Sequence, residues 1–384
     1  MLSLASAQTL FELGIGQTLL VMLAGYSIDD SDSKSSFLHP INLLLTATKY
    51  IYMVSSVSFL VFGGALGCFI LNSGGLEASY WVYPWFFLCV AIAGNLYINR
   101  GLIYIESAGR VQEVYSLRVA QVVIGSLFFV LLIFAGGELW AVCAIPLSSL
   151  ILGLLFLIRF SKLSDPPNSG ANYSLSMIFK FYMARLFPLQ WKVSISFVCG
   201  FLSLQFFLPL VFKYYGPVVA GQLGLSLNVM TGVTLLSSSY STGNIQVLSS
   251  LVASNNFRSL NSLFLKSIRF SVLVSLAVLL PFNIASFFVE GLSSLLPSHT
   301  VLLILTIACF FNAVTYCCAI YLRSFLAEPL LIPSVLSTFS LYVLLFAVGS
   351  KSLVLFVSSY ALSSFFVLAC ALAIGYDQAN SVST

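Results

Sequence analysis

The residues best able to do chemistry in this sequence are ionisable side chains placed within long apolar stretches. Glu12 lies near the middle of such a stretch, residues 1–26. Because a charge inside a bilayer is costly, an ionisable residue at this depth is a functional candidate by default. A carboxylate shielded from water can switch between charged and neutral forms, so Glu12 is a candidate for coupling to a proton or a cation. The alternative is that Glu12 faces a basic partner or lies near the membrane surface.

Three basic residues, Arg118, Lys192 and Lys213, lie at the ends of apolar stretches. They could bind an anionic phosphate group, and the planar guanidinium of Arg118 is suited to bidentate contact with phosphate oxygens. The alternative is that each is an anchor whose charged end reaches the membrane surface while its stem stays among apolar groups.

Uncharged polar residues within the apolar stretches form a second group of candidates. Most are expected to make hydrogen bonds between helices, and examples are Asn95, Gln121, Ser203 and Asn312. Others could line a polar cavity, and the candidates for this role are Gln17, Gln205, Gln222 and Asn228.

Composition places all of these residues in a membrane protein. Only 7% of the 384 residues are charged and 59% are hydrophobic, with a mean hydropathy of +1.03. Soluble domains carry about 25% charged residues, so a water-soluble fold is excluded. The sequence has two histidines, no glycine-rich nucleotide loop with lysine and no His/Glu metal constellation. We therefore expect neither an enzyme nor a cofactor or metal site, and the eight cysteines are interpreted as small buried side chains.

Runs of about 18 or more residues with few charges predict an all-α membrane protein with eleven spanning helices. The predicted spans are 1–26, 50–71, 80–98, 117–136, 139–160, 191–213, 216–239, 268–289, 300–321, 332–349 and 353–375. Fourteen of the sixteen Lys and Arg residues follow odd-numbered spans, and only Lys213 and Lys351 follow even-numbered ones. The positive-inside rule therefore places the odd-numbered loops and the C-terminus in the cytoplasm. Glu106 and Arg110 are expected on a solvated cytoplasmic surface.

An internal repeat predicts three regions: an N-terminal helical lobe at 1–160, a cytoplasmic linker with a basic amphipathic segment at 161–190, and a C-terminal lobe at 191–384. Aligning the lobes from their C-terminal ends pairs Gln17 with Gln222. In this alignment the first helix of the second lobe has no partner. We therefore expect a parent architecture of six plus six spans, with five plus six here and the first helix absent from this chain.

Four short motifs resemble those of polysaccharide-biosynthesis flippases. They are LFELGIGQ at 10–17, ESAGRV with YSLR at 106–118, LQWK at 189–192 and YYGPVVAGQ at 214–222. The family they resemble is that of the Wzx-type O-antigen flippases, within the multidrug/oligosaccharidyl-lipid/polysaccharide exporter (MOP) superfamily. The resemblance implies a two-lobed transporter that moves an undecaprenyl-pyrophosphate-linked sugar repeat unit across the bacterial inner membrane by alternating access, driven by an ion gradient.

The resemblance also implies where the substrate binds and which partners are expected. Flippase cavities are lined by cationic residues, and Arg118, Lys192 and Lys213 match that role by position. The expected partners are the lipid-linked oligosaccharide, the lipid bilayer, and a polysaccharide polymerase with its chain-length regulator; no nucleic acid is expected. The alternatives are a drug or metabolite exporter of the same superfamily and a membrane enzyme of polysaccharide assembly, a polymerase or an acyltransferase.

Overall fold

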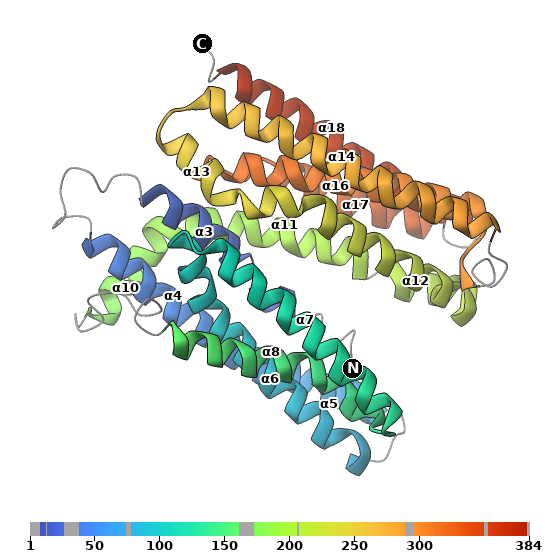
Figure 1. Cartoon of the computed structure of the whole chain (residues 1–384). Helices are drawn as coiled ribbons and strands as arrows, with labels where there is room; N and C mark the ends of the chain where they lie inside the picture. Colours follow the sequence, from blue (N-terminus) through green and yellow to red (C-terminus); the bar gives the residue numbers. More distant parts are fainter. Residues whose placement is uncertain are drawn as a thin grey trace. The chain divides into compact units, whose positions relative to one another are not determined.

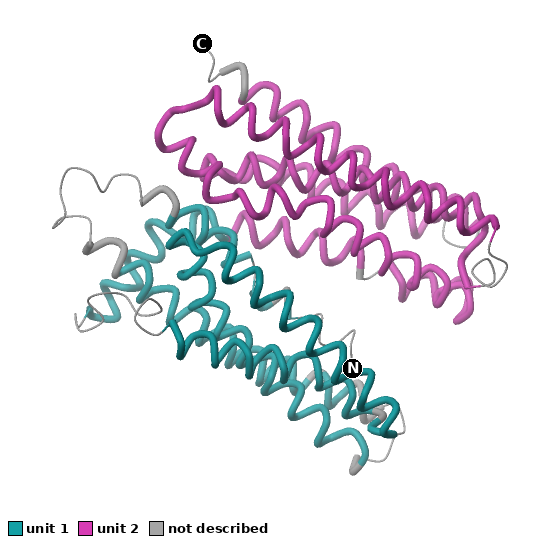
Figure 2. Tube along the Cα trace, in the orientation of Figure 1, with its two compact units in different colours: residues 1–190 teal, residues 191–384 magenta. Residues whose placement is uncertain are grey.

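The computed structural model describes residues 8–12, 14–26, 38–73, 78–160, 173–205, 207–288, 295–348 and 352–381. These residues form helices joined by turns, with no β-strand among them. Helices satisfy their own backbone hydrogen bonds, which is what a hydrocarbon environment without water demands. The chain divides into two compact units, unit 1 at Met1–Gln190 and unit 2 at Trp191–Thr384 (Figure 2).

Unit 1 is arranged around one long helix, α6 (Ala78–Ser107), which packs against helices before and after it in the chain. Ser56 donates a hydrogen bond to the Ala93 carbonyl oxygen at 2.7 Å and so ties α4 to α6. The other helical elements of unit 1 are α2 (Gln8–Glu12), α3 (Ile15–Tyr26), α4 (Leu38–Ser58), η2 (Phe59–Gly63), α5 (Gly64–Ser73), α7 (Val111–Phe134), α8 (Glu138–Arg159), α10 (Leu175–Phe181) and η3 (Tyr182–Leu186) (Figure 1).

The first predicted span, 1–26, is not one continuous helix. Helix α2 ends at Glu12 and α3 begins at Ile15, with Gly14 between them at a φ of 65°. This left-handed conformation is open to glycine at little cost and is rare for other residues. The prediction of an uninterrupted helix was wrong because apolar composition alone does not reveal a break of this kind.

The second predicted span, 50–71, begins twelve residues too late. The helical stretch starts at Leu38, passes through the π-helical turn η2 and ends with α5 at Ser73. Close packing in this stretch depends on Gly67, because a Cβ atom there would overlap the buried indole of Trp85. The indole nitrogen of Trp85 also donates to the Gly64 carbonyl oxygen at 3.2 Å.

Unit 2 is arranged around α16 (His299–Arg323), which packs against α12, α14 and α18. The predicted repeat pairs α6 with α16, and each has the most buried apolar window of its own unit. The remaining elements are α11 (Phe187–Gln205), α12 (Phe207–Gly243), α13 (Ile245–Ala253), α14 (Phe257–Phe288), α17 (Leu331–Val348) and α18 (Leu353–Ser381), where α11 begins in unit 1 (Figure 1).

Helix α12 contains a break at Gly216, whose φ of 84° and ψ of 176° are not helical. Only glycine adopts this region without strain, and Pro217 then suits the first position of the helix that follows. The break lies at the predicted boundary between spans 191–213 and 216–239.

The hydrogen bonds expected between helices are present in both units. In unit 1, Asn95 donates to the Pro146 carbonyl oxygen at 2.8 Å and Gln121 to that of Ser149 at 2.9 Å. In unit 2, Asn312 donates to the hydroxyl of Tyr360 at 2.9 Å. These side chains therefore link helices, which was the simpler of the two interpretations of buried polar residues.

The length and apolar composition of the helices confirm that the chain is a multi-pass membrane protein. Eight helical stretches of the described residues are long and apolar enough to cross a bilayer. One of them, Leu175–Ala253, runs from α10 through α13, and Leu331–Ala347 is a shorter apolar helix. Six of the eight free cysteines are buried as expected, whereas Cys68 is exposed on α5.

Candidate functional site

The candidate site in unit 1 forms around Glu12, at the end of α2. The side-chain amide of Asn99, on α6, donates a hydrogen bond to Glu12 Oε1 at 2.7 Å. Gly16, on the first turn of α3, leaves space beside this carboxylate. A Cβ atom there would lie 3.3 Å from Glu12 Oε1 and 3.5 Å from the hydroxyl oxygen of Tyr52. After the break at Gly14, the carboxylate of Glu12 and the hydroxyl of Tyr52 both lie beside Gly16.

Tyr52, on α4, contributes a buried hydroxyl to this site. Its side chain is 0% exposed, and its hydroxyl has no hydrogen-bond partner among the described residues. A buried polar group without a partner is uncommon because it loses its hydrogen bonds to water. The hydroxyl is therefore available to a proton, a water molecule or a cation held by Glu12.

Arg118 brings a positive charge to the same region. Its guanidinium lies 3.6 Å from Glu106, and it interacts electrostatically with both Glu12 and Tyr52. The Arg118 side chain remains 44% exposed, whereas that of Glu106 is 3% exposed. One side of the guanidinium thus faces a buried acid, and donors on the exposed side remain accessible to an anion.

The expectation that Glu106 lies on a solvated surface was wrong. Helix α6 continues to Ser107, nine residues beyond the predicted end of its span, and carries Glu106 into the protein. A turn with Gly109 at a φ of 86° then folds α7 back beside α6. Arg110 does lie on the surface, where it pairs with Glu113 at 3.2 Å and both side chains are 42% exposed.

Of the predicted site residues, the structure places Glu12 and Arg118 in one cluster of unit 1. Gln17 lies on α3 of the same unit and is half-buried. The other five candidates belong to unit 2: Lys192, Lys213, Gln205, Gln222 and Asn228.

The basic candidates of unit 2 lie beside aromatic rings. The Lys192 ammonium is 5.9 Å from the ring centroid of Trp191, and that of Lys213 is 5.6 Å from the ring of Tyr214. Both lysines are exposed. Asn228 is exposed and Gln222 is half-buried on α12, whereas the side chain of Gln205 lies outside the described residues.

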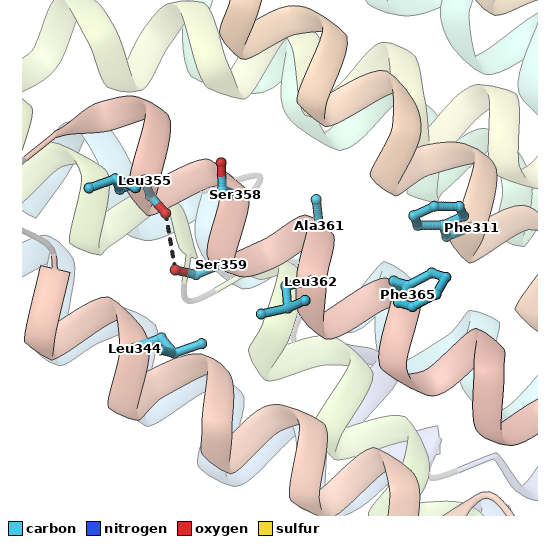
Figure 3. A pocket seen from close by; sticks show the side chains of 8 residues that line it. All are labelled: Phe311, Leu344, Leu355, Ser358, Ser359, Ala361, Leu362 and Phe365. Carbon is cyan, nitrogen blue, oxygen red and sulfur yellow. Dashed lines mark hydrogen bonds between the residues drawn. The ribbon is translucent and has the colours of Figure 1, made fainter.

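Unit 2 also contains an apolar groove of about 540 Å³ formed by α16, α17 and α18. Its two hydroxyl groups are already bonded within α18, because Ser358 donates to the Val354 carbonyl oxygen at 2.7 Å and Ser359 to that of Leu355 at 3.0 Å. The groove therefore presents hydrocarbon rather than free donors. Figure 3 shows its lining residues, which are Phe311, Leu344, Leu355, Ser358, Ser359, Ala361, Leu362 and Phe365.

A buried ion pair lies in unit 2 and was not predicted. Arg323, the last residue of α16, donates two hydrogen bonds to the Glu328 carboxylate, at 2.6 and 3.0 Å. The guanidinium also lies 5.1 Å from the ring centroid of Phe197. The five-residue spacing of Arg323 and Glu328 across a Pro-containing turn was the only signal in the sequence. Over the described residues no group of three His, Cys, Asp or Glu side chains is arranged to hold a metal ion.

Comparison with known proteins shows that the fold of this chain is similar to that of several solved structures. No protein-family model matches the sequence, and no curated protein matches it. Among solved structures, a MOP-superfamily transporter from Pyrococcus furiosus has a TM-score of 0.75 at 12% identity, covering 99% of this chain and 86% of that one. That transporter is described as having a binding pocket of reversed polarity that suggests a different function.

Two further structures agree with this likeness. The Vibrio cholerae MATE transporter VcmN in its bent form has a TM-score of 0.73 at 11% identity, covering 99% of this chain and 87% of that one. A multidrug-resistance MATE transporter in an outward-facing conformation has a TM-score of 0.70 at 13% identity, with 99% and 86% covered. These neighbours are membrane transporters, not enzymes, and the chain has the fold of the MOP superfamily.

Proposed function

We propose that this protein is a flippase that moves undecaprenyl-pyrophosphate-linked oligosaccharide repeat units across the bacterial inner membrane. The observation that carries the proposal is Arg118, a half-exposed guanidinium that lies 3.6 Å from the buried carboxylate of Glu106. It belongs to the YSLR motif that resembles flippase sequences. A pyrophosphate offers the oxygens that a guanidinium binds in bidentate fashion.

The apolar groove of unit 2 supports a substrate that is partly hydrocarbon. A groove whose hydroxyl groups are bonded within their own helix has little to offer a sugar or a phosphate, and it suits a lipid chain. The proposal therefore divides the substrate by chemistry. In unit 1, Arg118 is assigned to the pyrophosphate and Gln17 to the sugars. In unit 2, Lys192 and Lys213 are further cationic candidates, Gln205, Gln222 and Asn228 are candidates for the sugars, and the apolar groove suits the tail.

Glu12 is the proposed coupling group. The groups that face it are Asn99, which donates to it at 2.7 Å, the unpartnered hydroxyl of Tyr52 beside Gly16, and the charge of Arg118. Uptake of a proton or a cation by Glu12 would leave more of the Arg118 charge available to an anionic substrate. Binding of the ion at Glu12 would then raise the affinity of Arg118 for the substrate, and binding of the substrate would raise the affinity of Glu12 for the ion.

The test is complementation in a host whose own flippase has been deleted, scored by surface polysaccharide. Arg118→Gln combined with Glu106→Gln removes the cation without leaving an unpaired buried carboxylate, and we expect it to insert normally and to abolish complementation. Arg110→Gln, which removes a neighbouring surface cation, is the matched control and should complement fully. Full activity of the Arg118/Glu106 double variant would contradict the proposal.

Coupling is tested separately by Glu12→Gln in vesicles with an imposed pH or sodium gradient. We expect transport by this variant to lose its response to one of the gradients, whereas Glu113→Gln, an acid-to-amide change at the surface, should keep it. A variant at Glu12 that responds to both gradients as the parent does would remove Glu12 from the coupling mechanism and leave the flippase proposal standing.

A drug or metabolite exporter is the second candidate, because neighbours of similar fold are multidrug-resistance MATE transporters. The two functions separate in the same host. An exporter would raise resistance to drugs and leave surface polysaccharide unrestored, whereas a flippase would do the reverse.

A further inference from the structure

The segment that precedes α11 has two faces of different character. Helix α10 begins after Ser174, whose hydroxyl accepts a hydrogen bond from the Met177 backbone N–H at 3.3 Å, and it leads through the π-helical turn η3 into α11. On one face Ile178 and Leu186 are buried, and α10 packs there against α4. The segment is therefore fixed to unit 1 along this face.

The other face exposes large apolar side chains at helical spacing. Leu175, Phe179 and Met183 follow one another every four residues, and they are 68%, 62% and 43% exposed. Residues four apart lie next to each other on a helix, so these three form one stripe. Contiguous exposed apolar surface of this kind marks a site of contact with a protein or a membrane.

Basic side chains flank this stripe. Lys180, in the last turn of α10, and Arg185, in η3, are both exposed. Neither is paired with an acidic side chain among the ion pairs of the described residues. A short amphipathic helix with Leu and Phe on one face and Lys or Arg beside it is the pattern of a helix that lies in the membrane interface.

We infer that Leu175–Phe187 lies in the headgroup layer of the cytoplasmic leaflet and binds acidic phospholipid. Leu175, Phe179 and Met183 reach the start of the acyl chains, while Lys180 and Arg185 contact lipid phosphates. The occupant follows from charge complementarity: the cytoplasmic leaflet carries the negative lipids, and the positive-inside rule places this basic segment on that side. The inference is independent of the transported substrate.

The inference is tested on the whole protein in lipid nanodiscs. Phe179→Trp adds a fluorophore on the stripe, and lipids brominated near the top of their acyl chains quench an indole that reaches them. We expect the added emission to be quenched, whereas that of Ala108→Trp, on the exposed turn between α6 and α7, should be unaffected. Equal, negligible quenching at both positions would place the stripe in water and overturn the inference.

Lipid charge is tested in mixtures of phosphatidylcholine and phosphatidylglycerol. Neutralising Lys180 or Arg185 to Gln should each lower the preference for brominated phosphatidylglycerol at the Phe179→Trp position by up to about fivefold. Arg110→Gln, a surface cation elsewhere in unit 1, should leave the preference unchanged. An unchanged preference in the double Lys180→Gln/Arg185→Gln variant would contradict acidic-lipid binding.

A protein partner is the competing occupant of the same stripe. A photoreactive benzoylphenylalanine placed at position 179 in cells should yield lipid adducts and no discrete cross-linked polypeptide. A single polypeptide adduct of fixed mass would overturn the inference in favour of a protein-docking face.

Discussion

At the scale of single residues, the site of unit 1 combines two charged side chains with neutral polar ones. Glu12 and Arg118 stand out because charge inside apolar stretches is rare. Asn99 and Tyr52 carry no such signal, since amides and phenols are frequent in membrane helices and only the fold shows which of them face Glu12. Glu106 was misplaced because its helix continues beyond the last strongly apolar residue.

The buried hydroxyl of Tyr52 gives a prediction that separates stability from function. Because the hydroxyl has no partner, Tyr52→Phe should not lower the melting temperature, while it should reduce gradient-driven transport if the hydroxyl serves an ion held by Glu12. Tyr342→Phe is the control, since it removes a 2.9 Å bond to the Leu202 carbonyl oxygen and should cost about 0.5–1.5 kcal/mol. A clear drop in melting temperature for Tyr52→Phe would mean that its hydroxyl is bonded in the working protein.

The buried pair of Arg323 and Glu328 gives a second prediction. Glu328→Gln leaves a guanidinium without its counter-charge and should destabilise unit 2 by about 3–5 kcal/mol. Replacing both residues, Arg323→Met with Glu328→Leu, should cost much less, because no unpaired charge remains. Thermal unfolding of the detergent-purified protein measures both. Equal losses in the single and double variants would contradict this account.

At the scale of elements, hydropathy predicted where most helices lie but misplaced several of their ends. Predicted spans at 139–160, 300–321 and 332–349 lie within two residues of α8, α16 and α17 at each end. The errors fall where polar residues extend a helix past its apolar core, as at the start of α4 and the end of α6. The break at Gly14 depends on backbone conformation, which apolar content does not encode, whereas the break at Gly216 falls at a predicted boundary between two spans.

Packing between α5 and α6 gives a prediction at this scale. In Gly67→Ala the new Cβ would overlap the indole of Trp85, which is buried and cannot move freely. We expect a loss of about 1–3 kcal/mol, as for other overpacked sites. Gly64→Ala is the control in the same helix, where a Cβ meets no atom within 4 Å. Fluorescence-detected size-exclusion chromatography after heating compares the two, and equal melting would refute the packing argument.

At the scale of the whole molecule, composition predicted the class of fold, and the motifs predicted the superfamily whose fold the chain shares. The internal repeat predicted from the spacing of the loops pairs α6 with α16, and each of these is the central helix of its own unit. Substrate specificity is not readable at this scale, because structures of similar fold share only 11–13% identity with this chain. We propose that it depends on a handful of side chains such as Arg118.

Orientation in the membrane gives the prediction for the molecule as a whole. A reporter that is active only in the cytoplasm should function when it is fused after Ser381 and fail when it is fused after Ser352, on the opposite side of α18. A periplasm-specific reporter should give the reverse pattern. Cytoplasmic activity at both positions would show that α18 does not cross the bilayer.

The pair of Arg323 and Glu328 also bears on how the protein is made. The two residues are five apart in sequence, on the turn that joins α16 to α17. Their charges can therefore neutralise each other as soon as this corner has formed, before the last helix of unit 2, α18, has packed against α16. The positive-inside rule keeps this corner on the cytoplasmic side, so α16 and α17 can turn back into the bilayer there without leaving an unpaired charge buried in the protein.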